Sequence, residues 1–228
     1  MTWYVSDDLV DIRGKDPNSQ YRRKWCEARA VEPTYGEPLT CPQCGRDISG
    51  FQWLKPWRIR LTSSRYPDRI SDSLPATVYF VVSERFMNAY KASDLRGIGA
   101  FHPLETVKVA RNHNPETYPK YYSAEINFTT EIKINLEKSE IYGRLYDWKC
   151  SLCNPRGGLT NRIEKIVLDV AKQDKDIVRV GGLGVVNGVL MSQRFFDFVE
   201  EHGFTNFNLV DVSEFKFGAG TTFGSNRR

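Results

Sequence analysis

Cys41-Pro42-Gln43-Cys44-Gly45 and Cys150-Ser151-Leu152-Cys153-Asn154 are the two stretches of sequence expected to decide the fold. Each holds two cysteines in a C-x2-C spacing, which lets both sulfur atoms reach one ion from a tight turn. Gly45 and Asn154 are the residue types that most readily adopt the positive φ of such a turn. Because one pair supplies only two of the four ligands of a structural zinc, we expect Cys41, Cys44, Cys150 and Cys153 to bind a single zinc ion.

Two other interpretations of the cysteine pairs stay open at the level of sequence. They can be redox-active dithiols, although neither pair opens a helix after a strand as in a thioredoxin-like protein. They can also be buried thiols that bind no metal. The fifth cysteine, Cys26, stands beside Trp25 and is interpreted as a lone packed thiol.

A second pattern recurs at the spacing of the cysteine pairs, which lie 109 residues apart. At the same offset, residues 81–86 (VVSERF) fall on residues 190–195 (LMSQRF). Agreement of two distinct motifs at one offset predicts an internal duplication. The first unit is predicted to span residues 1–110 and the second residues 111–217, packed as one compact domain. Residues 218–228 are rich in Gly, Ser, Thr and Arg and are predicted to be disordered.

The predicted fold class is α+β, with two duplicated strand–helix–strand units joined by the shared zinc-knuckle site of four cysteines. Strands are expected at residues 76–82 and 185–191, and helices at residues 84–93 and 193–202. Alternating polar and apolar residues predict additional antiparallel strands within residues 121–136.

Ser83 and Ser192 stand directly before the two predicted helices. A serine hydroxyl at this place accepts a hydrogen bond from a free backbone N–H of the first turn. Both helices then carry apolar residues at i, i+3 and i+4, which gives each one a face to bury. These residues are Phe86, Ala89 and Tyr90 in the first helix, and Phe195, Phe198 and Val199 in the second.

Composition is that of an ordinary globular protein, with 40% hydrophobic and 26% charged residues in 228. The formal net charge is only +4, and the charges are interspersed, so composition does not demand a nucleic-acid partner. The N-terminal residues lack the apolar stretch of a secretory signal, and no apolar run is long enough to cross a membrane. We therefore expect a cytoplasmic protein without a membrane partner.

Candidate catalytic residues do not form a recognisable set in the sequence. The histidines, His102, His113 and His202, have no obvious acidic partner nearby in sequence. Ser83 and Ser192 are not surrounded by a G-x-S-x-G motif, and the glycines of residues 181–184 lack the spacing of a phosphate-binding loop. The sequence predicts a protein that is not an enzyme.

The arrangement resembles the double-CXXCG motif proteins of bacteria. The resemblance is carried by Cys41 to Gly45, by Cys150 to Cys153, by Ser192-Gln193-Arg194-Phe195 and by Gly203-Phe204, and it spans roughly residues 39–217. Asn154 departs from the family pattern, which has glycine there. The resemblance implies an immunity protein that binds and neutralises a cognate toxin, with zinc as its structural cofactor. It says nothing of the oligomeric state, the toxin or the contact surface.

A zinc-ribbon protein that binds nucleic acid is the alternative function. Basic and aromatic residues are mixed in Arg22-Arg23-Lys24 and residues 53–60 (WLKPWRIR), and such mixtures can stack nucleic-acid bases. Aromatic residues next to a zinc knuckle also pack beneath it in many folds, so this signal is weaker than that of the cysteines.

Overall fold

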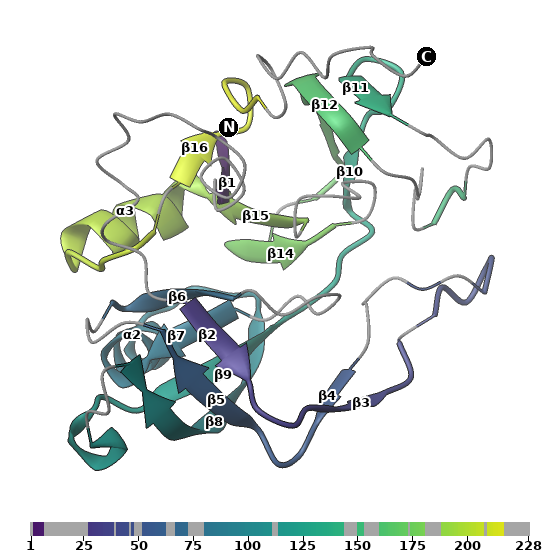
Figure 1. Cartoon of the computed structure of the whole chain (residues 1–228). Coiled ribbons are helices and arrows are strands. Elements are labelled where there is room, and N and C mark those ends of the chain that lie inside the picture. The colour runs from purple at the N-terminus through teal and green to yellow at the C-terminus, as the bar shows by residue number, and fades with distance from the viewer. Residues whose placement is uncertain are drawn as a thin grey trace, which may run out of the picture.

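The computed structural model describes residues 2–6, 27–38, 40–45, 47, 52–62, 67–72, 80–110, 114–143, 150–152, 160–172, 174–180, 188–207 and 209–216. Within these residues it contains sixteen strands, two α-helices and one short 3-10 helix. The chain forms two halves that face each other, with the closed sheet of the first below the open sheet of the second in Figure 1. The predicted tail, residues 218–228, lies outside the described residues.

A closed six-stranded sheet forms the first half. Its strand order is β2 (Glu27–Ala30), β5 (Arg58–Leu61), β8 (Ile98–Val109), β9 (Tyr121–Ile126), β7 (Phe80–Ser83) and β6 (Arg69–Asp72), which pairs with β2 again. The pairs β2–β6 and β5–β8 are parallel, and the others are antiparallel. Alternating residues point inward, so that Ile59, Leu61 and Tyr121 are fully buried within the sheet.

A four-stranded antiparallel sheet forms the second half. Its strand order is β14 (Ile177–Arg179), β15 (Val189–Ser192), β1 (Trp3–Ser6) and β16 (Leu209–Asp211). The N-terminal strand β1 is therefore a central strand of a sheet that otherwise comes from the C-terminal part of the chain. Trp3 and Val5 on β1 enter the same buried cluster as Leu190 on β15.

Three two-stranded sheets complete the described β-structure. They pair β3 (Thr34–Gly36) with β4 (Gln52–Leu54), β10 (Ile132–Ile134) with β13 (Leu168–Val170), and β11 (Glu140–Gly143) with β12 (Thr160–Lys165). The 3-10 helix η3 (Pro115–Thr117) lies between β8 and β9.

The two helices are α2 (Glu84–Ala92) and α3 (Gln193–Glu201), each directly after a buried strand. The predicted caps are confirmed, because Ser83 accepts from the backbone N–H of Phe86 and Ser192 from that of Phe195, both at 3.2 Å. Within the described residues no helix has the length and apolar character needed to span a membrane.

The prediction of an α+β fold built from two duplicated strand–helix–strand units is wrong. Strands dominate the described chain, and the strands that follow the two helices have different roles. After α2 the chain enters β8, which pairs with β5 and β9 in the closed sheet. After α3 it enters β16, whose one partner among the described strands is β1. Pairing between distant strands thus overrides the local likeness of the two strand–helix segments. The boundary predicted at residues 110 and 111 stays a prediction.

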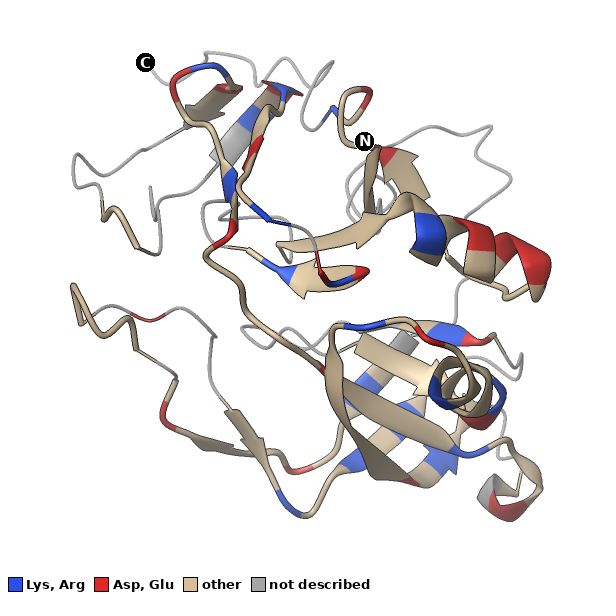
Figure 2. Ribbon diagram, turned by 180° about the vertical axis from the view of Figure 1, so that it is seen from behind, with Lys and Arg blue, Asp and Glu red and all other residues tan. Residues whose placement is uncertain are grey.

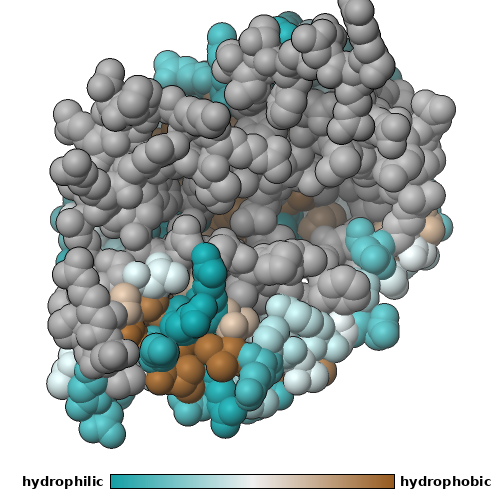
Figure 3. All heavy atoms as spheres, in the orientation of Figure 1, coloured by the Kyte–Doolittle hydropathy of each residue, from teal (hydrophilic) through white to brown (hydrophobic). Residues whose placement is uncertain are grey.

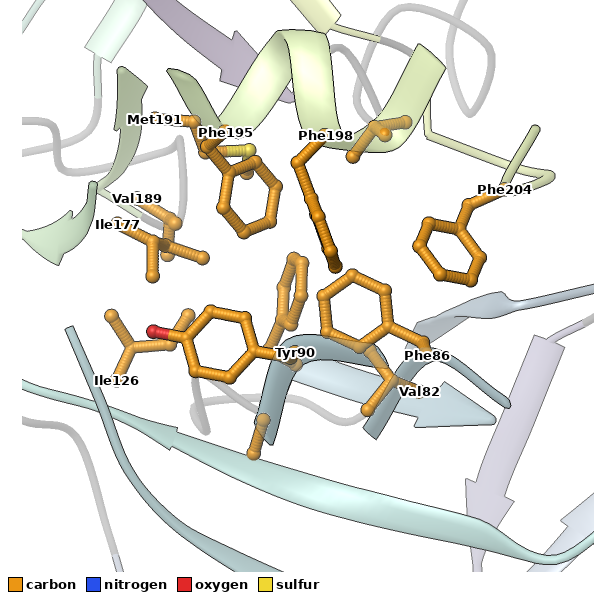
Figure 4. Packing of buried hydrophobic residues seen from close by; sticks show 13 residues of the cluster. Val82, Phe86, Tyr90, Ile126, Ile177, Val189, Met191, Phe195, Phe198 and Phe204 are labelled. Carbon is orange, nitrogen blue, oxygen red and sulfur yellow. The ribbon is translucent and has the colours of Figure 1, made fainter. Parts of the chain in front are cut away.

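An aromatic core joins the halves. Phe86 from α2 and Phe195 from α3 are both fully buried, with ring centroids 6.1 Å apart. Phe86 also meets Phe198 at 5.8 Å and Phe204 at 5.1 Å. Figure 4 shows the side chains of both helices pointing toward one another between the two sheets. These separations are typical of favourable edge-to-face and offset ring contacts.

Two buried carboxylates reinforce this junction, and the first is Asp68. It accepts hydrogen bonds from Ser83 Oγ at 2.8 Å and Arg85 Nη2 at 2.7 Å, both in its own half. From the other half it accepts the backbone N–H of Thr205 at 3.0 Å. Arg85 also donates to the carbonyl of Gly203 just after α3. The carboxylate and its arginine therefore hold the segment that follows the opposite helix.

Asp176 makes the reciprocal set of contacts. It accepts from Ser192 Oγ at 3.0 Å within its own half and from the backbone N–H of Arg96 at 3.0 Å across the junction. Arg194 lies 3.5 Å from Asp176 and forms a closer ion pair of 2.6 Å with Asp94, just after α2. Each half thus holds the chain that leaves the helix of the other half.

Candidate metal centre

The first cysteine pair lies in the loop between β3 and β4. Thr40 and Asp47 form an antiparallel bridge that closes this loop. Inside it, the backbone N–H of Gly45 donates to the carbonyl of Cys41 at 2.8 Å. Gly45 has φ of +69°, a conformation that costs a residue with a Cβ about 1 kcal/mol or more. The glycine therefore lets the chain turn back tightly enough to bring Cys41 and Cys44 to one point.

The second cysteine pair begins between β11 and β12. Cys150 is described together with Ser151 and Leu152, and Cys153 lies outside the described residues. Gln43 Nε2, from the middle of the first loop, donates to Ser151 Oγ at 3.0 Å. The tips of two loops that are more than a hundred residues apart in sequence are therefore in direct contact.

Three thiols converge where these loops meet. Cys41 Sγ and Cys150 Sγ are 3.8 Å apart, and the sulfur atoms of Cys41, Cys44 and Cys150 all lie within 4.8 Å of one another. A disulfide needs about 2.05 Å between sulfur atoms, so the distance between Cys41 and Cys150 is far too long for one. Four sulfurs placed about 2.3 Å from a tetrahedral zinc would be separated by about 3.8 Å. The cluster can hold a metal ion.

The surroundings suit a closed site. Cys41 is 1% exposed and Cys150 is 5% exposed, whereas Cys44 is on the surface. Phe128 and Leu152 pack against the two buried cysteines and exclude water from one side. Lys133 Nζ donates to the carbonyl of Ser151, beside Cys150, and so brings a positive charge close to the cysteine cluster.

The structure therefore brings together three of the four predicted ligands, Cys41, Cys44 and Cys150. Cys26, interpreted as a lone packed thiol, lies outside the described residues, as does Cys153. Lys133 and Phe128 were not predicted at this site, because each reaches it through contacts between distant segments.

The histidines make contacts that sequence reasoning did not predict. His102 Nε2 on β8 lies 3.2 Å from Glu125 Oε2 on β9, and its ring is 4.6 Å from that of Trp57. The acidic partner is 23 residues away and becomes a neighbour only through strand pairing. His202 ends α3, where Nδ1 lies 3.0 Å from the carbonyl of Phe198. His113 lies outside the described residues.

Comparison with protein-family models gave no match, and comparison with curated proteins gave none.

Proposed function

We propose that Cys41, Cys44, Cys150 and Cys153 bind one structural zinc ion. The observation that carries the proposal is the convergence of three sulfur atoms within 4.8 Å of one another. Thiolates are ligands that zinc favours. A C-x2-C turn that begins at Cys150 supplies Cys153 as the fourth ligand. Four protein ligands leave no position for substrate, so the ion has a structural role.

The proposed ion joins two loops whose cysteines are 109 residues apart. Binding such an ion can contribute on the order of 10 kcal/mol to folding. It fixes the loop between β3 and β4 against the segment that follows β11. Metal analysis of the purified protein is expected to give one zinc per chain. A chain that folds and holds no metal after purification without chelator would contradict the site.

We propose further that the chain is a non-enzymatic immunity protein that binds and neutralises a toxin. Its support is the resemblance carried by the two cysteine pairs, together with a scaffold made rigid by the metal site and the aromatic core. An inhibitor of this kind needs a fixed surface complementary to its target.

The test is co-expression with the polypeptide encoded beside it. We expect the two polypeptides to co-purify as a complex. We also expect co-expression to restore growth at levels of the neighbouring polypeptide that are toxic when it is expressed alone. The Cys41→Ser variant tests the role of the metal-stabilised scaffold, because loss of the metal is expected to weaken rescue. Absence of both complex and rescue would contradict the proposal.

The tryptophans that suggested nucleic-acid binding have other contacts. Trp53 is only 5% exposed and belongs to the core of the closed sheet. Trp57 lies against His102, and Lys55 Nζ is 5.1 Å from the centre of its ring. A base stacks on an accessible ring face, so these positions favour the protein-binding proposal over the alternative.

A further inference from the structure

A row of three basic residues crosses neighbouring strands of the closed sheet. Arg29 on β2 is the register partner of Arg60 on β5, and Arg60 is the register partner of Lys108 on β8. All three side chains lie toward the outside of the sheet, and Arg60 stands between Ile59 and Leu61, which are fully buried. Because neighbouring strands are about 4.8 Å apart, the row concentrates three positive charges within about 10 Å. We call these residues the basic row.

The basic row contrasts with the pair next to it on the same strands. Arg58 and Glu105 are also register partners on β5 and β8, and they form an ion pair of 3.1 Å. This opposite-charge pairing is the arrangement that stabilises sheets. At Arg60 and Lys108, like charges face each other, and neither forms an ion pair with a residue that the structure describes. Such a pair is unfavourable for the sheet itself.

The surface around the basic row suits a protein partner better than a nucleic acid. The exposed large hydrophobic residues of the described chain are Tyr35, Leu54, Tyr142 and Val170, and none lies on β2, β5 or β8. The described residues of these three strands therefore offer no large exposed aromatic ring on which a base could stack.

The figures agree with this description. Figure 2 shows basic segments on neighbouring strands of the closed sheet, while acidic segments gather at the far end of α3. Figure 3 shows strongly hydrophilic residues beside a small hydrophobic area over the closed sheet.

We infer that the basic row is the docking face for an acidic surface of the partner protein. The inference rests on the proposed function, because it assigns the face by which the toxin is bound. Carboxylates of the partner would meet Arg60 and Lys108. Such complementarity accelerates association and makes it sensitive to salt.

The first test uses a short fluorescent poly-L-glutamate peptide as the probe, in anisotropy titrations at low and high salt. The Arg60→Glu/Lys108→Glu variant is compared with Lys138→Glu/Lys172→Glu, which changes net charge equally at exposed lysines elsewhere. We expect the first variant to weaken binding by about tenfold or more, and the second by much less. Equal weakening by both would show that only net charge matters and would overturn the inference.

Two further measurements have outcomes that bear on the inference. One titrates an oligothymidylate of similar length, and the other measures self-association of the protein alone. Tighter binding of the oligonucleotide through the same residues would assign the face to nucleic acid and overturn the inference. Self-association that is lost in Arg60→Glu/Lys108→Glu would make a second copy of the chain the occupant, through the acidic end of α3, and would also overturn the inference.

The thermal midpoint of Arg60→Thr is expected to be no lower than that of the wild type, which separates a binding role of Arg60 from a structural one.

The second test uses the complex with the neighbouring gene product. If the complex forms and is insensitive to Arg60→Glu/Lys108→Glu, the docking face is wrong and the proposed function stands. If no complex forms while poly-L-glutamate binding still follows the basic row, the proposed function fails and the assignment of an acidic ligand to this face stands. The two failures are thus distinguished.

Discussion

Cys41 and Cys150 are equivalent at the residue scale, because both are buried and their sulfur atoms are 3.8 Å apart. We expect Cys41→Ser and Cys150→Ser to reduce bound zinc and to lower the free energy of unfolding by similar amounts, since each removes one of four shared ligands. Metal analysis and chemical unfolding measure the two effects. Cys26→Ser is the control and is expected to keep the metal. A large difference between the two ligand variants would contradict a shared site.

The carboxyl group of Asp68 makes the stability of the folded protein depend on pH. Burial raises the pKa of this carboxyl, but hydrogen bonds from Arg85, Thr205 and Ser83 outweigh it, so its pKa is lowered in the folded state. A carboxyl with a lowered pKa stabilises the fold above its unfolded pKa of about 3.9, and the stabilisation is lost as pH falls through the folded value. We expect Asp68→Asn to be less stable than wild type at pH 7, with the difference shrinking below about pH 4.

The measurement for Asp68 is the free energy of unfolding of both proteins across that pH range. Asp174→Asn is the matched control, because Asp174 is partly exposed and its contact with Lys172 is long, at 3.8 Å. The free energy of unfolding of Asp174→Asn is expected to match that of the wild type at every pH. A difference between Asp68→Asn and wild type that stays constant down to about pH 2 would contradict the assigned cause.

At the scale of elements, the turn between α2 and β8 is fixed by a close approach of backbones. Gly97 has φ of +126°, and a Cβ there would lie 1.8 Å from the carbonyl oxygen of Ile177 on β14. Gly203, after α3, also has a positive φ, but a Cβ there would meet nothing within 4 Å. The first glycine lets the two halves touch, whereas the second only ends a helix.

We therefore expect Gly97→Ala to cost several times more stability than Gly203→Ala. The second change costs about 1 kcal/mol for the left-handed conformation alone. The first adds a clash with backbone atoms that cannot move without separating β14 from the turn. Chemical unfolding of the two variants measures the difference. Equal losses would mean that the junction adapts more readily than the packing indicates.

The sequence predicted the elements that depend on local signals. The helices were expected at residues 84–93 and 193–202 and are found at Glu84–Ala92 and Gln193–Glu201. A capping serine and an apolar face lie within a few residues of each other, so both signals can be read locally. The segments in which the preceding strands were expected to begin fall largely outside the described residues, and the strands are described at Phe80–Ser83 and Val189–Ser192.

The closed sheet and the place of β1 could not be predicted in this way. The parallel pairing of β2 with β6, and the antiparallel pairing of β1 with strands nearly two hundred residues later, depend on contacts that no local pattern specifies. The cysteines were easier to place, because zinc chemistry requires four ligands and only two pairs were present. The neighbours of the site, such as Lys133 and Phe128, depend on the fold and were missed.

At the scale of the whole molecule, the cysteine cluster is not the only connection between the halves. Phe86 and Phe195 are fully buried in a core to which both helices contribute. Asp68 and Asp176 each receive a backbone N–H from the opposite half. The cysteines form a separate small cluster with Phe128 and Leu152. The molecule therefore has two connections that differ in chemistry, one apolar and charge-assisted and one made by cysteines, which we propose to depend on a metal.

Removing the metal should then loosen one connection and leave the other. With a chelator present, we expect amide hydrogens of residues 40–45 and 150–152 to exchange faster, because the thiolates repel one another once the cation is gone. Protection of α2 and α3 should change much less, since burial of each large aromatic side chain is worth about 3–5 kcal/mol without any metal. Hydrogen exchange with mass spectrometry on the full chain, before chelation and after zinc is restored, measures both. If the helices lose protection together with the cysteine loops, the aromatic core depends on the ion and the two connections are one cooperative unit.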